Sequence, residues 1–130
     1  MIAYATFGAL DKDASTKFFE AVLAPLGYAK FYDENWAGFA VGGNPEGPGT
    51  IWVGPPFDGN EARPSNGSMI SLTAPSRAAV REFHAQALAN GGTSEGEPGV
   101  REIYGPDYYL AYVRDPAGNK LAAICRSTGE

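Results

Sequence analysis

Apolar residues alternate with polar ones at the start of the chain and then follow a helical spacing. Over Ile2–Gly8, Tyr4 and Thr6 point to one side of a predicted strand, and the residues between them point to the other. Residues 13–23 carry apolar side chains at i and i+4, which predicts a helix that Pro25 ends. Three further strands are predicted after it, over residues 28–32, 36–41 and 50–53.

The same order of elements is predicted again after a loop that is rich in glycine and proline. Residues 68–73 alternate as a strand, and residues 76–90 carry a helical stripe that includes Val80 and Phe83. A weaker strand is predicted around Val100–Tyr104. The stretch "YYLAYVRDPAGNKLAAICR", residues 108–126, predicts two strands joined by a tight turn.

Both halves therefore predict a strand, a helix and about three further strands, at a spacing of roughly half the chain. Each half alone is a small sheet with a helix on one face and nothing on the other, so the halves have to combine to bury their apolar surface. We predict one α+β domain, with module one over about residues 1–57 and module two over about residues 67–130. The two mixed sheets are expected to form a cup-like cleft.

Composition narrows the classes of function rather than naming one. The chain has 130 residues, of which 44% are hydrophobic and 12% aromatic, enough to fill one core. A formal net charge of −5 disfavours nucleic acid and anionic membranes as partners, because both require a basic surface. The N-terminal segment lacks a signal-peptide pattern, and the single cysteine, Cys125, excludes an intramolecular disulfide, so we expect a cytoplasmic protein.

The opening "MIAYATFGALDKDASTKFFEAVLAPLGYAKF", the second start "MISLTAPSRAAVREFHAQALANGG" and the closing "YYLAYVRDPAGNKLAAIC" resemble the vicinal oxygen chelate superfamily. This superfamily includes glyoxalases, bleomycin-resistance proteins and extradiol dioxygenases. The resemblance covers essentially the whole chain, and the Asp-Pro-x-Gly-Asn turn is one of its moderately specific marks. It implies the cup of the glyoxalase/bleomycin resistance/dihydroxybiphenyl dioxygenase fold, and it implies a homodimer.

The resemblance also implies where a divalent metal would be held in the enzymes of that superfamily. His or Gln from the first strand of each module and Glu from the last strand are the usual ligands. Here these positions fall on Tyr4, Met69 and Ala122, and the last strand of module one, "TIWVG", has no carboxylate. The only histidine, His84, is expected to be a partly exposed residue of the second helix. We therefore expect no cofactor and regard a divalent metal as disfavoured.

Without metal ligands, the cleft becomes more apolar and aromatic, as small-molecule sites often are. Arg101 among tyrosines suits a carboxylate or phosphate and a planar ring, although tyrosines are also common in ordinary sheets. Cys125 and Trp36 are expected to serve packing, and no catalytic residue is assigned. The candidate ligand-binding residues are Tyr4, Thr6, Trp52, Met69, Ser71, Arg101, Tyr104, Tyr108 and Tyr109.

Three hypotheses about function follow. The leading one is a glyoxalase-like protein that has lost the usual metal ligands and binds a small planar or aromatic organic molecule. One alternative is a metal-dependent lyase (such as a lactoylglutathione lyase-like enzyme), isomerase or dioxygenase, with an unusual ligand set such as Tyr4 with Glu102 or Asp107. The other is a dimeric interaction protein without a small ligand. The sequence leaves open whether the cup closes within one chain or across a dimer.

Overall fold

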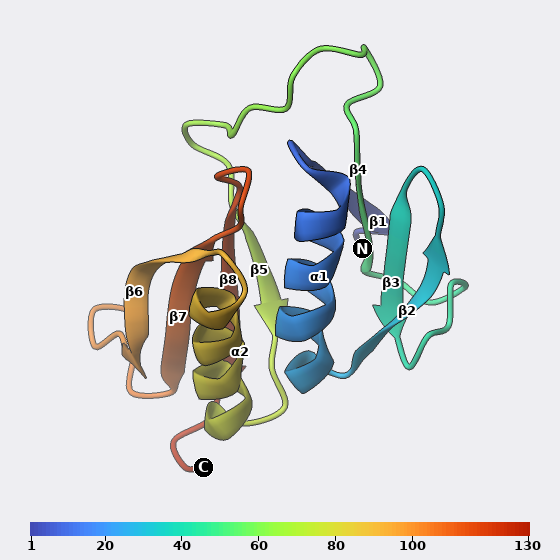
Figure 1. The fold of residues 1–130 in the computed structure, drawn as a ribbon. Coiled ribbons are helices and arrows are strands. Elements are labelled where there is room, and N and C mark those ends of the chain that lie inside the picture. The colour runs from blue at the N-terminus through green and yellow to red at the C-terminus, as the bar shows by residue number, and fades with distance from the viewer.

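The computed structural model describes residues 1–130 and contains two modules with the same order of elements (Figure 1). The first module comprises β1 (Tyr4–Gly8), α1 (Lys12–Leu23), a short 3-10 helix η1 (Ala24–Leu26), β2 (Tyr28–Asp33), β3 (Ala37–Val41) and β4 (Thr50–Gly54). The second comprises β5 (Ile70–Thr73), α2 (Arg77–Ala89), β6 (Thr93–Val100), β7 (Tyr108–Arg114) and β8 (Lys120–Arg126). A linker, residues 55–69, connects them.

Each module folds into a four-stranded mixed sheet, here called the first sheet and the second sheet. The strand order is β1-β4-β3-β2 in the first sheet and β5-β8-β7-β6 in the second. The pairs β1–β4 and β5–β8 are parallel, and all other neighbouring strands are antiparallel. No hydrogen-bonded strand pair joins the two sheets, so no closed barrel forms. The predicted α+β class with two mixed sheets is confirmed.

Both long helices begin at a residue whose side chain caps a free backbone amide. The Asp11 carboxylate accepts a hydrogen bond from the Ala14 amide at 3.1 Å, and the Ser76 hydroxyl accepts one from the Ala79 amide at 3.0 Å. The helical segment of the first module ends at Gly27, whose φ of 91° is a backbone conformation that favours glycine. Neither of these helices, nor η1, is long and apolar enough to cross a membrane.

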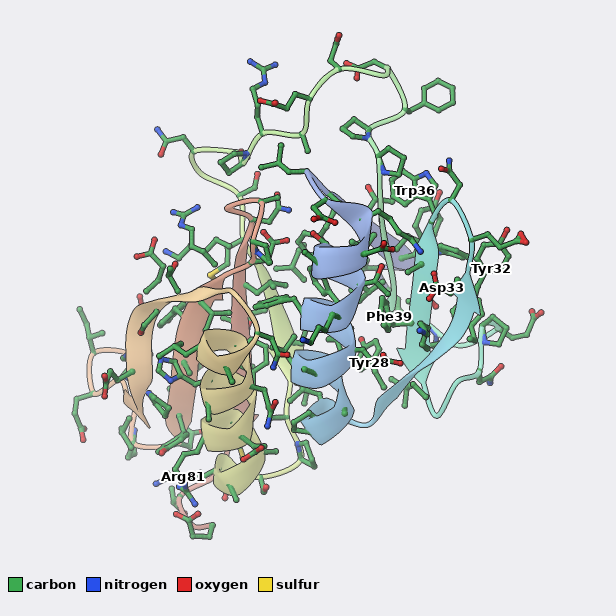
Figure 2. All side chains as sticks on the ribbon, in the orientation of Figure 1. Tyr28, Tyr32, Asp33, Trp36, Phe39 and Arg81 are labelled. Carbon is green, nitrogen blue, oxygen red and sulfur yellow. The ribbon has the colours of Figure 1, made fainter.

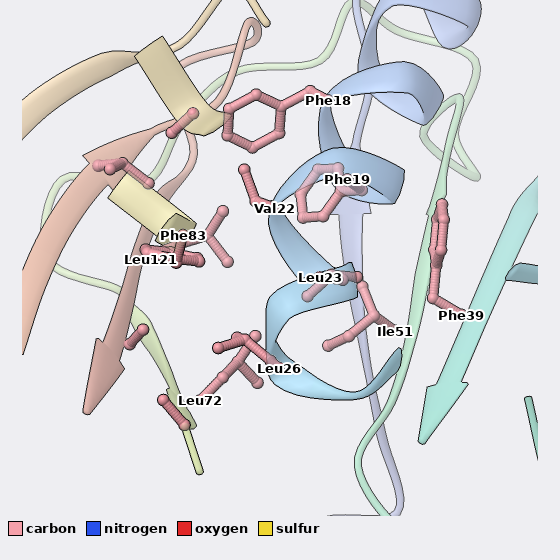
Figure 3. Packing of buried hydrophobic residues seen from close by; sticks show 14 of the residues in the cluster. Phe18, Phe19, Val22, Leu23, Leu26, Phe39, Ile51, Leu72, Phe83 and Leu121 are labelled. Carbon is pink, nitrogen blue, oxygen red and sulfur yellow. The ribbon is translucent and has the colours of Figure 1, made fainter. Parts of the chain in front are cut away.

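One hydrophobic core unites the two modules. The helices α1 and α2 lie side by side in the middle of the molecule, between the two sheets (Figure 1). A single cluster of 22 buried residues draws on both helices and on one face of each sheet. Figure 3 shows Phe19 and Leu23 of α1 near Phe39 of the first sheet, with Leu72 and Leu121 of the second sheet on the other side of the helix. Because the core uses one face of each sheet, the opposite face of each sheet has no helix on it.

The predicted bounds agree with the structure to within two residues for every strand and helix but one. The strand predicted around Val100–Tyr104 is wrong, because residues 102–104 form a turn and the fourth strand of the second sheet is β6. The β6 segment contains Gly96 and Pro98, which argue against a strand, but it is an edge strand that pairs with β7 alone.

The expectation for the single histidine is also corrected. His84 is only 7% exposed, and its Nε2 lies 2.8 Å from the Ser94 hydroxyl on β6. The α2 helix turns this residue toward the second sheet, and a neighbouring strand supplies the polar partner that a buried imidazole requires. His84 is therefore a structural residue between α2 and β6.

Candidate binding site

The open face of the first sheet, the face that α1 does not cover, carries a group of aromatic side chains. Tyr4 and Thr6 lie on β1 and Trp52 lies on β4, and the strand register pairs Thr6 with Trp52. Their neighbours Phe7 and Val53 are buried in the core. Alternation along the two strands therefore separates the core from the open face.

Trp52 is held by aromatic rings from β2. Its ring centroid lies 5.3 Å from that of Phe31 and 5.8 Å from that of Tyr32, both in edge-on geometry. Two consecutive residues reach the same indole because the register of β2 against β3 shifts between Lys30 and Tyr32. Gly38 leaves room for the indole, since a β-carbon added there would lie 2.9 Å from it. The Trp52 ring therefore packs directly on the backbone of β3.

Trp36 and the linker complete a pocket of about 1000 Å³ over this face. Figure 2 shows Trp36 at the end of the hairpin formed by β2 and β3, beside the start of the linker. The Trp36 ring packs on Gly54, the last residue of β4. The walls include Tyr4, Tyr32, Trp36 and Trp52, together with linker residues 56–58 and 60–65.

Two titratable side chains of this pocket have altered acidity. The Glu34 carboxylate raises the pKa of the Tyr32 phenol through Coulombic repulsion and by accepting its hydrogen bond at 3.2 Å. Hydrogen bonds from Asn60, including one from its amide at 2.9 Å, lower the pKa of the Asp58 carboxyl. At neutral pH the pocket therefore has a neutral phenol at one wall and a carboxylate on the exposed linker.

A smaller pocket of about 280 Å³ lies where the two modules meet. It is lined by the end of β1, by the start of β8, by Met69 just before β5, and by Arg63 and Ser65 of the linker. The side-chain amide of Asn119 donates a hydrogen bond to the Gly8 carbonyl at 3.0 Å and so ties the turn between β7 and β8 to β1. Both sheets contribute to this pocket, whereas the larger one is built from the first sheet and the linker.

The open face of the second sheet is aromatic and positively charged. The guanidinium of Arg126 lies 4.0 Å from the ring centroid of Tyr108. Arg101 and Lys120 both lie over the ring of Tyr112, at 5.4 Å and 5.5 Å from its centroid. These distances are those of cation–π contacts, so the cations are held in place by the tyrosines of β7.

The structure brings together some of the candidate residues and separates others. Tyr4, Thr6 and Trp52 line the larger pocket, and Met69 shares the smaller pocket with Thr6. Ser71 pairs with Ala122 on the second sheet and lines neither pocket. The residues predicted from the first module are thus gathered in one place.

The candidates from the β6–β7 region have different surroundings. Tyr108 lies on the open face of the second sheet, with the exposed Tyr104 ring 5.9 Å away. The Arg101 guanidinium donates hydrogen bonds to backbone carbonyls, that of Glu97 at 2.7 Å among them. Tyr109 lies on the opposite face, beneath α2, where its hydroxyl accepts a hydrogen bond from Arg81 at 3.3 Å. None of these residues lines either pocket.

Four aromatic residues of the site were missed from the sequence: Phe31, Tyr32, Trp36 and Phe57. Alternation alone assigns Phe31 and Tyr32 to opposite faces, and only the shift in pairing brings both to Trp52. The sequence did contain one signal for the two indoles, because a glycine within a strand often marks a place where another group approaches the backbone closely. Gly38 lies under one indole and Gly54 lies under the other.

The residues at the metal positions of the superfamily do not fit a divalent ion. These positions hold a phenol at Tyr4, an indole at Trp52, a thioether at Met69 and a methyl group at Ala122. Divalent ions of the enzymes in this superfamily require oxygen and imidazole donors. In the chain as a whole, no group of three or more His, Cys, Asp or Glu side chains is arranged to hold a metal.

The alternative ligand set is not gathered either. Tyr4 lies on β1 of the first sheet, whereas Glu102 and Asp107 lie in the connection between β6 and β7 at the outer edge of the second sheet. The Asp107 carboxylate accepts a hydrogen bond from Arg126 at 3.3 Å. One chain therefore keeps the three donors of that set apart.

Comparison with known proteins was made by family models, curated proteins and solved structures. No family model and no curated protein matches the chain. A crystal structure of a glyoxalase/bleomycin resistance protein from Albidiferax ferrireducens is similar at 36% identity and a TM-score of 0.84, over 98% of this chain and 99% of that one.

Two more distant structures share the fold. A glyoxalase/bleomycin resistance protein/dioxygenase family enzyme from Burkholderia phytofirmans has 16% identity and a TM-score of 0.69, over 96% of this chain and 98% of that one. Lactoylglutathione lyase from Agrobacterium tumefaciens has 19% identity and a TM-score of 0.63, over 95% and 92%. The Albidiferax protein is 36% identical to this chain over almost the full length of both. This chain therefore belongs to the glyoxalase/bleomycin resistance protein family of the vicinal oxygen chelate superfamily.

Proposed function

We propose that this family member binds a small planar or aromatic organic molecule against the open face of the first sheet, and that it does so without a divalent metal. The observation that carries the proposal is the aromatic wall of Tyr4, Tyr32, Trp36 and Trp52 around a pocket of about 1000 Å³. Pockets of that size hold drug-sized molecules, and aromatic walls bind planar rings by stacking.

The packing of the two indoles supports this use. Trp52 is fixed by Phe31 and Gly38, and Trp36 is fixed by Gly54. Side chains that are held in place before binding lose little conformational entropy when a ligand arrives. Recognition by shape and stacking needs no cation, which agrees with the phenol, indole, thioether and methyl groups at the positions used for metal in the superfamily.

Tryptophan fluorescence gives a direct test. The chain has two tryptophans, Trp36 and Trp52, and both line the pocket, so their emission reports on this site alone. Titration with a panel of planar aromatic compounds is expected to give saturable quenching with at least one of them. Trp52→Leu is expected to weaken binding of that compound, measured by calorimetry. Tyr104→Leu, at an exposed aromatic position outside both pockets, is the matched control and is expected to bind as the wild type does.

Metal content is measured on the same preparation. Elemental analysis after dialysis is expected to find no stoichiometric divalent ion, and calorimetric affinity is expected to be the same with and without a chelator. A stoichiometric ion that survives dialysis, or binding that the chelator abolishes, overturns the metal-free part of the proposal. Absence of binding across the whole panel overturns the rest.

We also propose that the protein forms a homodimer. Large side chains on and around the open faces are exposed, including Tyr4 at 61%, Tyr32 at 44% and Met69 at 38%. Exposed apolar groups of this kind favour self-association. Light scattering coupled to size-exclusion chromatography is expected to give twice the mass of one chain, and a single-chain mass at every concentration would refute the dimer.

A further inference from the structure

The two pockets are parts of one continuous depression. Thr6, Gly8, Arg63 and Ser65 line both of them, so a molecule in the larger pocket can extend into the smaller one. The chemistry changes along this path. The far end of the larger pocket is aromatic, whereas the smaller pocket is lined mainly by polar and charged side chains.

Two cations line the smaller pocket, Arg63 from the linker and Lys120 from the first position of β8. Neither forms an ion pair, whereas five of the ten Lys and Arg side chains of the chain do. Glu95, which has a Coulombic interaction with Lys120, is itself bound to Arg114 at 2.7 Å. Asp58 attracts Arg63 only from beyond ion-pair range. The lining of this pocket thus combines two cations that form no ion pair with no carboxylate, in a chain whose net charge is −5.

Lys120 is half-buried and packs against an aromatic ring. Its ammonium group lies 5.5 Å from the ring centroid of Tyr112, and the guanidinium of Arg101 lies over the same ring. The lining of the smaller pocket contains Lys120 and Arg63 but no carboxylate, so the potential in this pocket is positive. An anion bound there would be attracted by both side chains.

Hydroxyl groups supply further hydrogen-bond donors beside the two cations. The Ser65 hydroxyl donates to the Ser68 hydroxyl at 3.2 Å, which leaves the Ser68 proton free to donate. Thr6 lies at the boundary between the two pockets. The Asn119 side-chain amide, by contrast, already donates hydrogen bonds to Gly8 and to Asp115. It therefore stabilises the wall of the pocket and has no free donor for a ligand.

From these observations we infer that the ligand is an aromatic compound carrying a carboxylate or comparable oxyanion. Its ring stacks on the indoles of the larger pocket, and its anionic group binds Arg63 and Lys120 in the smaller one. This inference rests on the proposed function and adds the charge and the orientation of the ligand. Charge-assisted hydrogen bonds from Lys and Arg to an oxyanion are stronger than neutral ones, so the anionic group contributes affinity as well as direction.

The test compares naphthoate with naphthamide, which have the same rings and nearly the same shape but differ in charge. Calorimetry on the wild type is expected to show naphthoate binding about tenfold more tightly. Lys120→Gln and Arg63→Gln are each expected to lower the affinity for naphthoate and to leave that for naphthamide unchanged. Lys17→Gln, an exposed lysine of α1 outside both pockets, is the control and is expected to change neither.

The outcomes separate this inference from the proposed function. If naphthamide binds as tightly as naphthoate, or if Lys120→Gln and Arg63→Gln weaken both probes alike, the anion site is wrong and aromatic binding stands. If neither probe nor any compound of the wider aromatic panel binds, both proposals are wrong. A preference for naphthoate that Lys17→Gln removes equally would reflect general charge and would also overturn the site.

Discussion

The indole of Trp36 packs so closely on Gly54 that a β-carbon at residue 54 would lie 2.7 Å from its Cγ and 2.8 Å from its Cε2. Non-bonded carbon atoms need about 3.5 Å, so any side chain at this position would push the indole away. The last residue of β4 therefore fixes one aromatic wall of the pocket. The requirement is for the absence of a side chain, since Gly54 is not among the residues with positive φ.

Gly54→Ala is expected to displace Trp36 and to lower the free energy of unfolding by about 1–3 kcal/mol through overpacking. The tryptophan emission spectrum should shift and aromatic binding should weaken. Gly47→Ala is the control, because the β-carbon would meet its nearest atom at 3.5 Å, and it should resemble the wild type. An unchanged emission spectrum in Gly54→Ala would contradict the packing described for Trp36.

Phe19 is the aromatic centre of the core, and its truncation should be costly. The ring is fully buried and lies 5.2 Å from that of Phe7 and 5.3 Å from that of Phe18. Phe19→Ala is expected to lower the free energy of unfolding by about 3–5 kcal/mol, measured by urea denaturation. Phe57→Ala removes the same ring from an exposed position of the linker and should change stability by less than about 0.5 kcal/mol. Similar losses in both variants would rule out this account of the core.

Asp115 holds the turn between β7 and β8 from a buried position. Its carboxylate accepts hydrogen bonds from the amide of Ala117 at 2.9 Å and from the amide of Asn119 at 2.8 Å. Asp115→Ala leaves these donors without a partner, and a loss of about 1–3 kcal/mol in the free energy of unfolding is expected. Thermal and chemical denaturation measure it.

The exposed linker offers a matched comparison for that turn. Asp58 accepts a hydrogen bond from the amide of Asn60 at 2.9 Å in the same local geometry, but water can replace it there. Asp58→Ala should therefore cost less than about 0.5 kcal/mol. If the exposed and the buried variant lose equal stability, burial is not what makes Asp115 important.

Lowering the pH should remove the contribution of the Asp33 carboxylate to stability. Hydrogen bonds from Lys12 and Lys30 hold the pKa of the Asp33 carboxyl below its usual value. A folded-state pKa below the unfolded one means that stabilisation is present above about pH 4 and is lost as the pH falls through the folded pKa. The difference in Tm between wild type and Asp33→Asn should shrink from about pH 6 to about pH 2.

Glu46→Gln is the control for that titration. Glu46 is exposed and forms no ion pair, so its substitution should leave the dependence of Tm on pH unchanged. A gap between wild type and Asp33→Asn that stays constant across the acid range would show that the two lysines do not stabilise the carboxylate.

The helices and most strands were predictable because their local signals agree with one another. Asp11 and Ser76 mark the helix starts, and alternation marks β1, β5, β7 and β8. The β6 strand was missed because local composition there opposes strand formation, and only pairing with β7 provides the stabilisation. The position of β6 therefore depends on tertiary contacts, which the local sequence pattern does not reveal.

The candidate site was predictable only in part, for a related reason. Strand periodicity is enough to put Tyr4, Thr6 and Trp52 on one face. Trp36 and Arg63 come from a turn and a linker, whose positions depend on which surface they cross. The hydrophobic periodicity of the sequence does not reveal the path of a turn or a linker, so these contacts could be identified only from the structure.

The outermost strands of the two sheets have a consequence for how copies of this protein can meet. Along β6, Pro98 lacks a backbone N–H and the charged Glu95 and Glu97 disfavour pairing with another strand, and along β2 the bulge near Lys30 distorts the backbone. Neither border can readily template a strand from another molecule. Growth into extended fibrils by strand addition at β2 and β6 is thereby disfavoured, which leaves β1 and β5 as the regular border strands of the two sheets.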